Sequence, residues 1–147
     1  MRFFFNILKT GAALLWYNKR TMHISTKAEW ILRIAVAGEF LGHGVFGLQQ
    51  KEGWVKFFEV VGIAPEQALT VLPIVGAMDI ALALIVLVWP LRAALLWMAL
   101  WGFWTALLRP LAGDPVWDFV ERWANWGAPL AILVLRGWPK SVKEWFS

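Results

Sequence analysis

Two apolar stretches of the sequence carry side chains that can bind or move a proton. Glu39 and His43 are four residues apart in RIAVAGEFLGHGVFGL, and Asp79 interrupts the segment LPIVGAMDIALAL. A histidine and a carboxylate can relay protons where their environment tunes them for it. An ionised carboxylate at the middle of a membrane costs a few kcal/mol, so Glu39 and Asp79 are each expected to be protonated, paired or in contact with water.

A second set of polar side chains lies in RPLAGDPVWDFVERWANWGAPL, between Arg109 and Leu130. At helical spacing four of its residues share one face, namely Asp118, Glu121, Arg122 and Asn125. Just before it, Thr105 is four residues from Arg109 and follows Trp101 by one turn. We therefore predict Glu39 and His43 as catalytic residues, with a binding set made of Asp79, Trp101, Thr105, Arg109, Glu121, Arg122 and Asn125.

A purely structural role is the alternative for the residues near the start of the last helix. Acidic side chains such as Asp114, Asp118 and Glu121 are favoured in the first turns of a helix by its dipole. Glu121 or Asp118 can pair with Arg122 or Arg109 merely to fix helix packing. A single buried histidine is also more often a hydrogen-bonded core residue than a ligand. The functional hypothesis therefore depends on whether these residues converge on one interior site at the same depth.

Composition restricts what kind of protein can carry such a site. The chain has 147 residues, of which 60% are hydrophobic and 16% charged, whereas about 25% is usual for a soluble domain. An all-α integral membrane protein is therefore predicted, with room for four or five spans of about 20 residues and no soluble domain. Basic residues gather at the chain ends, which is typical of membrane orientation, and no nucleic-acid partner is expected.

The absence of cysteine and the scarcity of histidine limit the cofactors. Without cysteine there is no disulfide, redox CxxC motif, thiolate zinc site or iron–sulfur cluster. The only histidines are His23, in the polar N-terminal region, and His43. We therefore expect no metal, haem or iron–sulfur cluster to be bound by this chain alone.

The hydropathy pattern predicts a four-helix bundle preceded by a separate N-terminal segment. Residues 1–27 form that segment, which is interpreted as an amphipathic helix in the membrane interface; an uncleaved signal-like leader, or a native start at Met22, are the alternatives. The bundle occupies residues 28–138, and residues 139–147 form a cytoplasmic tail. Its spans are predicted at 28–50, 67–89, 91–108 and 115–138, with a short amphipathic surface helix within 53–65.

Several single residues carry structural expectations within these spans. Four glycines in the first span should let another helix approach closely, namely Gly38, Gly42, Gly44 and Gly47. Pro73 should bend the second span and Pro90 should end it. Asp114 precedes Pro115 as a helix N-cap would. Arg33, near the cytoplasmic rim, can extend its charge to the interface.

The lysine and arginine distribution predicts the orientation. Both chain ends belong to the more basic side, so the N- and C-termini are predicted to be cytoplasmic in a multi-pass protein of the inner (plasma) membrane. The polar set between Arg109 and Asn125 then faces the outer leaflet. The expected partners are the lipid bilayer and other membrane subunits, or further copies of this chain.

Four segments together resemble the DoxX-like family of small bacterial and archaeal membrane proteins. They are RIAVAGEFLGHGVFGL, LPIVGAMDIALAL, WGFWTALLRPLAG and ERWANWGAPLAIL. The resemblance covers about residues 28–135, and the second span ends in VWPLRAALL where many members have a glycine and small-residue motif, so a divergent member is indicated. The resemblance implies a four-helix fold and, because the best understood members are subunits of thiosulfate:quinone oxidoreductase, quinone chemistry near the outer face.

The predicted function is that of a small, quinone-associated membrane subunit of an oxidoreductase complex, inactive without a partner. In this hypothesis His43 donates to one quinone carbonyl, Glu39 holds its proton, and Trp101, Trp104, Trp123 and Trp126 line the cleft. The first alternative is a non-catalytic accessory subunit of a larger respiratory or photosynthetic complex. The second is a small proton-coupled transporter, suggested by Glu39 and Asp79 at the membrane midplane.

Overall fold

The computed structural model describes residues 26–147. The predicted interfacial helix within residues 1–27 therefore falls almost entirely outside the described residues. The chain divides into two units, residues 1–31 and residues 32–147, and every residue discussed below as part of a site belongs to the second unit.

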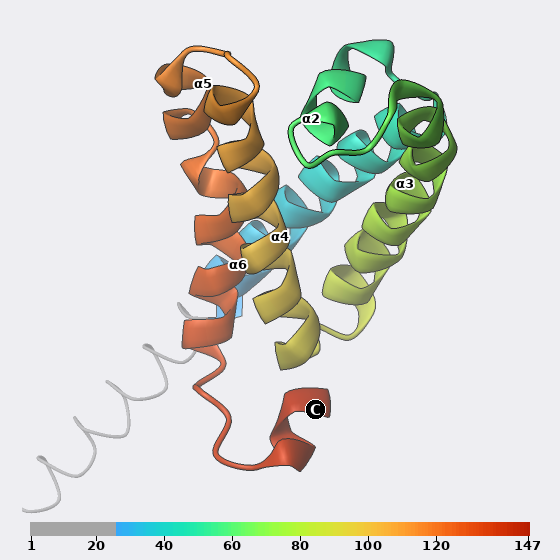
Figure 1. Ribbon diagram of the computed structural model, residues 1–147. Helices are drawn as coiled ribbons and strands as arrows, with labels where there is room; N and C mark the ends of the chain where they lie inside the picture. The colour runs from blue at the N-terminus through green and yellow to red at the C-terminus, as the bar shows by residue number, and fades with distance from the viewer. Residues whose placement is uncertain (1–25) are drawn as a thin grey trace, which may run out of the picture. The chain divides into compact units, whose positions relative to one another are not determined.

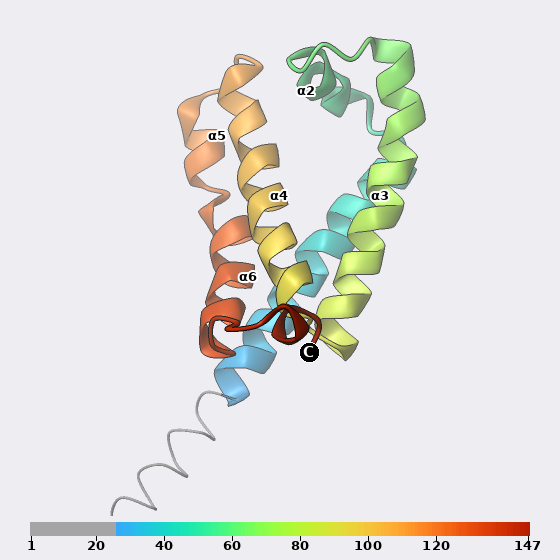
Figure 2. The same cartoon turned by 60° about the horizontal axis from the view of Figure 1, so that its bottom comes forward.

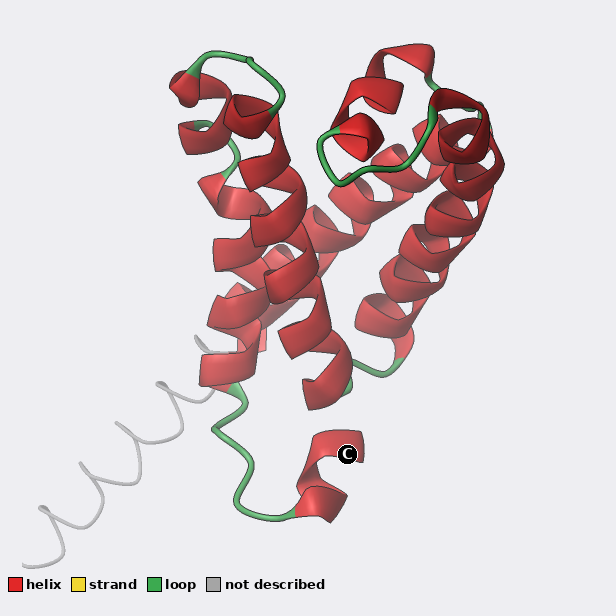
Figure 3. Ribbon diagram, viewed as in Figure 1, coloured by secondary structure: helices red, strands yellow, loops and turns green. Residues whose placement is uncertain are grey.

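The described residues are helical throughout, with turns and short loops between the helices, and contain no strand (Figures 1 and 3). An N-terminal helix, Thr26–Leu48, is followed by η1 (Glu52–Trp54), α2 (Val55–Glu59), α3 (Pro65–Val88), α4 (Arg92–Leu111), α5 (Val116–Val120), α6 (Trp123–Leu135) and η2 (Val142–Phe146). The N-terminal helix, α3 and α4 are long and apolar enough to cross a membrane. The predicted all-α fold class is thus confirmed, with three potential spans.

The predicted fourth span, 115–138, is not one continuous helix. It is divided into α5 and the 13-residue α6. The Arg122 side chain donates from Nη1 to the Asp118 carbonyl at 2.6 Å, an oxygen that would accept the Arg122 amide in a regular helix. That amide bonds to the Phe119 carbonyl instead, at 3.2 Å. A side chain inserted into the backbone ladder therefore accounts for the break.

The expected N-cap at the start of this region is also wrong. Pro115, not Asp114, is the N-cap residue of α5, and no side chain caps the helix. The Asp114 carboxylate instead pairs with the Lys56 ammonium of α2. A contact distant in sequence has replaced the local one.

Glycines allow the N-terminal helix and α3 to touch through their backbones. A Cβ added to Gly76 would lie 2.6 Å from the Gly44 carbonyl oxygen, and one added to Gly47 would lie 2.8 Å from the Gly76 Cα. A Cβ added to Gly38 or Gly42 would have nothing within 4 Å. The expected close approach therefore holds for two of the four glycines in the first span, with Gly76 as their partner.

Two side chains, one on the N-terminal helix and one in the turn that follows it, satisfy two carbonyls that prolines leave without a donor in α3. Pro90 has no N–H to offer the Val86 carbonyl, and Arg33 donates to that oxygen from Nε at 2.8 Å. A second Arg33 nitrogen bonds the Leu87 carbonyl. Arg33 is only 8% exposed, and its guanidinium caps the C-terminal end of α3.

The same arrangement recurs at the other end of this helix pair. Pro73 lies inside α3 and cannot donate to the Leu69 carbonyl. Gln50 Nε2 donates to that oxygen at 2.9 Å. Gln50 follows the N-terminal helix with a positive φ of 51°, a conformation that glycine usually supplies at a helix end. The residue is thus held where its amide can reach α3.

The C-terminal segment, of which residues 139–147 are the predicted tail, folds back against α4. Arg92 binds four backbone carbonyls of the C-terminal region, those of Arg136 (2.9 Å), Gly137 (3.1 Å), Glu144 (3.2 Å) and Ser147 (2.8 Å). Figure 2 shows this segment lying across the N-terminal end of α4. One guanidinium therefore joins the end of α6 to η2.

The apolar core lies in one half of residues 32–147, here called the packed half. It joins the N-terminal helix, the C-terminal part of α3, the N-terminal part of α4 and the C-terminal part of α6. Its buried residues are Val36, Ala37, Phe40, Leu82, Ala83, Val86, Leu95, Met98, Ile132 and Leu133. The site described next occupies the other half, here called the hollow half.

Candidate functional site

A cavity of about 310 Å³ opens between the N-terminal helix, α2, α3, α4 and the start of α6. Eight of the nine predicted site residues line it: Glu39, His43, Asp79, Trp101, Thr105, Arg109, Arg122 and Asn125. The remaining wall is mostly aromatic and aliphatic. Residues separated by more than 80 positions in the sequence thus share one interior space.

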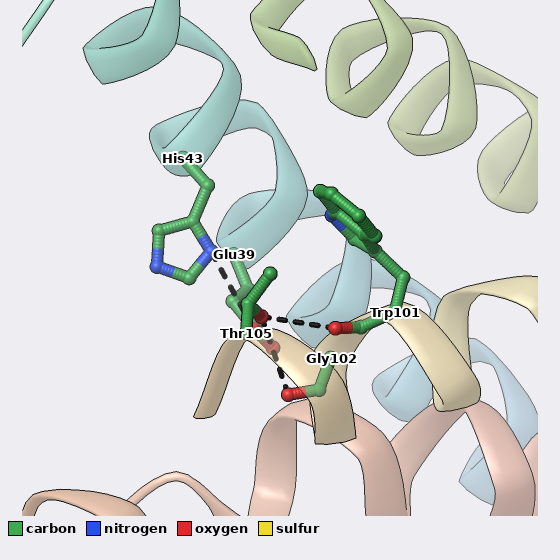
Figure 4. Close-up of polar contacts among 5 residues, drawn as sticks. All are labelled: Glu39, His43, Trp101, Gly102 and Thr105. Carbon is green, nitrogen blue, oxygen red and sulfur yellow. Dashed lines mark hydrogen bonds and ion pairs between the residues drawn. The ribbon is translucent and has the colours of Figure 1, made fainter. Parts of the chain in front are cut away.

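Glu39 and His43 lie on one face of the N-terminal helix and interact directly (Figure 4). The distance from His43 Nδ1 to Glu39 Oε1 is 3.7 Å, and the side chains are 33% and 23% exposed, respectively. The Trp54 ring meets the imidazole edge-on, with centroids 5.6 Å apart. Carboxylate and tryptophan together restrict the orientation of the imidazole, whose Nε2 is free of the Glu39 contact.

Asp79 is the most deeply buried carboxyl group of the cavity, at 4% exposure. The Trp101 indole on α4 lies near this carboxyl group as a potential donor. The carboxyl oxygen Oδ1 is buried and has no hydrogen-bond partner among the described residues. A buried polar atom without a partner carries a desolvation cost of about 1–3 kcal/mol, so this oxygen marks a place where a ligand or water is required.

Thr105 presents hydrogen-bond acceptors to the cavity. Its hydroxyl lies 3.0 Å from the Trp101 carbonyl and 3.3 Å from the Gly102 carbonyl, so the single hydroxyl hydrogen is directed to the helix backbone (Figure 4). The oxygen lone pairs remain available. Gly102 itself brings α4 close to α6, since a Cβ there would lie 2.8 Å from the Asn125 carbonyl oxygen.

Arg109 supplies positive charge in the last turn of α4. Its guanidinium carbon lies 5.0 Å from the centre of the Phe57 ring, a cation–π distance. Its Nε is buried and has no hydrogen-bond acceptor in the described part of the chain. The Nε donor is therefore held beside the cavity without an acceptor among residues 26–147.

Arg122 and Glu121 fit the structural alternative more closely. The Arg122 guanidinium bonds the Asp118 carbonyl and pairs with the Glu121 carboxylate. Glu121 does not line the cavity, and its side chain is 62% exposed. Arg122 borders the cavity with its donors partly engaged, whereas the Asn125 carboxamide forms no hydrogen bond within residues 26–147 and remains available.

The tryptophans divide into two groups. Trp101 and Trp104 line the cavity as expected. Trp123 and Trp126 do not; they pack edge-on in a separate aromatic cluster with Phe103 and Phe119, with ring centroids 5.8–6.4 Å apart. The prediction that Trp123 and Trp126 line the cavity is therefore wrong.

The sequence did not indicate that α2 would form a wall of the cavity. Trp54, Phe57 and Phe58 line it, followed by Val61 and Ile63, and Phe57 is 8% exposed. Figure 2 shows α2 between the ends of α3 and α4, and the Lys56–Asp114 pair ties it to the segment before α5. The amphipathic pattern within 53–65 predicted the helix, but not that its apolar side would face the protein interior.

The cavity combines an apolar body with hydrogen-bonding groups at two levels. Among residues 26–147 no group of three histidine, aspartate or glutamate side chains is placed to hold a metal ion. Such a space can hold a flat apolar molecule whose polar atoms meet Asp79, His43 and Arg109. Comparison with family models, with curated proteins and with solved structures finds no match for this chain.

Proposed function

We propose that this protein is a small membrane subunit that binds a quinone in the cavity and works within a larger oxidoreductase complex. The observation that supports the proposal best is the pair of buried, unpartnered polar atoms, Asp79 Oδ1 and Arg109 Nε. Both belong to residues that line the same apolar space. A ligand with oxygen atoms at two ends of a flat ring can bind both.

The lining residues are chemically suited to a quinone headgroup. Binding pockets for small molecules usually measure about 300–1,000 Å³, and this cavity, at about 310 Å³, lies at the lower end. Arg109, His43 and Asn125 carry donors for carbonyl oxygens, while Trp101 and Trp104 provide ring surfaces. A bound quinone supplies two-electron redox chemistry, and the Glu39–His43 pair is placed to hold or release a proton beside it.

A partner is part of this proposal. The chain has no cysteine for an iron–sulfur cluster, and only one of its two histidines, His43, lies in the predicted bundle, where a bis-histidine haem needs two. Electrons must then come from another subunit. The resemblance to DoxX-like membrane subunits favours the same arrangement and remains a prediction.

The membrane arrangement proposed for this function has four crossings. The N-terminal helix, α3 and α4 each have the length of a span, and α5 with α6 would form the fourth. Both termini would lie in the cytoplasm and the cavity toward the outer leaflet of the inner membrane, as the distribution of lysine and arginine suggests. A quinone could then enter from the lipid.

The proposal is tested by the quinone content of the protein purified in detergent from bacterial membranes. We expect about one quinone per chain, extracted and quantified by chromatography. The Glu39→Gln and His43→Ala double variant should lose most of it, since both cavity groups are removed. Glu121→Gln, the same chemical change outside the cavity, is the matched control and should retain the quinone.

Two outcomes would contradict the proposal. If the purified protein holds no quinone and binds none when it is added, the accessory-subunit alternative is favoured, especially if the protein co-purifies with a large complex. If the double variant keeps its quinone, the ligand does not occupy this cavity.

A small proton-coupled carrier is a second candidate, because Glu39 and Asp79 line the same cavity. Buried ionisable groups of this kind are typical of proton pathways. The test is reconstitution into liposomes with an imposed pH gradient. The carrier would be favoured if the protein dissipates the gradient. The Asp79→Asn variant should then fail to do so, and the control variant Asp118→Asn should still do so.

A further inference from the structure

The cavity has a deep end at Asp79 and an outer end at Arg109. We infer that the deep end accepts a hydroxyl group, and that the site therefore binds the reduced, hydroquinone form of its ligand more tightly than the quinone. This inference depends on the proposed function and names the form of the ligand that fits the site. It follows from the different hydrogen-bonding capacities of the two ends of the cavity.

The two unpartnered groups lie at different levels of α4. Asp79 lies near Trp101 of α4, whereas Arg109 lies eight residues further along the same helix. At about 1.5 Å per residue this separates the two levels by roughly 12 Å of helix axis.

The outer end does not distinguish the two forms. A guanidinium only donates hydrogen bonds, and Arg109 Nε is buried without an acceptor within the described residues. A quinone carbonyl oxygen accepts a hydrogen bond, and so does a hydroquinone hydroxyl oxygen. Arg109 should therefore contribute to the affinity for both.

The deep end does distinguish them. Asp79 Oδ1 is buried and no donor within the described residues bonds to it, so this oxygen is left to the ligand. An ionised Oδ1 needs a donor, and a protonated Oδ1 needs an acceptor. A hydroxyl meets either need, whereas a quinone carbonyl meets only the second. The hydroquinone is therefore the form that satisfies Oδ1 in every protonation state.

No hydrogen bond from residues 26–147 reaches Asp79 Oδ1. The adjoining helices bury the side chain and leave it 4% exposed. The neighbouring Thr105 hydroxyl directs its hydrogen to the carbonyls of Trp101 and Gly102. Thr105 can accept a hydrogen bond but offers none to Asp79, so the requirement for a donor falls on the ligand.

The test compares the two redox forms of one short quinone on the full-length protein. Duroquinone and durohydroquinone are titrated without oxygen into the protein in lipid nanodiscs, and binding is followed by calorimetry. We expect durohydroquinone to bind at least about tenfold more tightly, which is the ratio that one hydrogen bond to a charged group provides. Asp79→Asn should bring the ratio close to one, because a carboxamide can both donate and accept.

Asp118→Asn is the matched control, since Asp118 lies on α5 and does not line the cavity. It should keep the wild-type ratio. The comparison of the two redox forms on the wild-type protein needs no substitution, so it tests the inference even if the Asp79→Asn variant folds poorly. Thermal melting of each variant shows whether its fold is intact.

Each remaining outcome has a defined meaning. Equal affinities, or tighter binding of duroquinone by the wild type, would overturn the preference while leaving the proposed function in place. An unchanged ratio in a folded Asp79→Asn variant would overturn the assignment to Asp79. Failure of both forms to bind would overturn the proposed function together with the inference.

Discussion

The packed half and the hollow half of residues 32–147 share the N-terminal helix, α3, α4 and α6, but one is filled by apolar side chains and the other contains a cavity. In the packed half Leu95, Met98, Ile132 and Leu133 are fully buried, and the buried guanidinium of Arg33 donates to two carbonyls. In the hollow half a cavity of about 310 Å³ remains, and Asp79 Oδ1 and Arg109 Nε have no partner among the described residues. One end of the helices is organised for packing and the other for binding.

The comparison indicates how a short chain can keep a binding site open. Empty space and unsatisfied polar atoms both lower stability. Close packing at one end, with backbone contacts between glycines along the N-terminal helix and α3, offsets that loss. The predictions below test this division of roles, beginning with the largest expected effect.

Two leucines on α4 give the most direct test. Leu95 is fully buried in the packed half, and Leu108 lines the cavity. We expect Leu95→Ala to lower the free energy of unfolding by about 2–5 kcal/mol, because it creates a new void. Leu108→Ala enlarges a space that already exists and should cost less than half as much. Thermal and denaturant unfolding in one detergent measure both; equal losses would contradict the division into two halves.

Arg33 and Gln50, which donate to carbonyls that a proline cannot reach, form a second matched pair. Arg33→Met leaves the Val86 and Leu87 carbonyls without these donors in a buried site, and should cost about 1–3 kcal/mol. Gln50→Met removes the donor to the Leu69 carbonyl in an exposed site, where water can replace it. Its effect should be under about 1 kcal/mol. A larger loss of unfolding free energy for Gln50→Met than for Arg33→Met would show that the exposed contact contributes more to stability than the buried one.

The backbone contact along the cavity wall is tested by adding one methyl group. Gly76→Ala places a Cβ 2.6 Å from the Gly44 carbonyl oxygen, and the required separation of the helices should cost about 1–3 kcal/mol. Gly38→Ala is the control, because nothing lies within 4 Å of its Cβ position. It should be neutral or stabilising by up to about 1 kcal/mol. Similar melting temperatures for the two variants would exclude a close helix contact.

The smallest effect is expected at the C-terminal segment beneath the packed half. Hydrogen bonds from the Lys140 N–H (3.0 Å) and the Ser141 hydroxyl (3.1 Å) hold the pKa of the exposed Glu144 carboxyl group below its ordinary 4.5. Because the pKa is lower in the folded state, the stabilisation is complete above pH 4.5 and is lost as the pH falls through the folded-state pKa.

The fluorescence of the Trp138–Trp145 pair, whose ring centroids are 5.7 Å apart, should report this loss. We expect a small change with decreasing pH in the wild-type protein. Glu144→Gln has no carboxyl group to titrate and should lack that transition. Identical pH profiles for the two proteins would mean that Glu144 does not hold the segment.

Much of the candidate site could be predicted because it depends on local periodicity. A spacing of four residues places Glu39 and His43 on one face of any helix, and Thr105 and Arg109 on another. The apolar composition required long helices, and the bounds of the first three predicted spans lie within three residues of the helices observed. These features follow from the chemistry of neighbouring residues.

The remaining features depend on contacts between segments far apart in the sequence. Periodicity predicted an amphipathic helix between the first two spans, but whether its apolar side would face lipid or protein depends on the space between α3 and α4. Likewise, nothing near Arg33 specifies that it caps α3 beyond Pro90, and nothing near Asp114 specifies Lys56 as its partner. Tertiary structure decided these pairings.

The sequence by itself therefore determined the helices, their apolar character and the polar residues that can carry chemistry, since each is set within one or two helical turns. Only the tertiary structure decided that Glu121 lies outside the cavity, that Trp123 and Trp126 pack elsewhere, and that Asp79 Oδ1 and Arg109 Nε have no partner within residues 26–147. The physical reason is that a hydrogen bond or a void exists only once the opposing helix is in place, and no local pattern encodes which residues that helix will present.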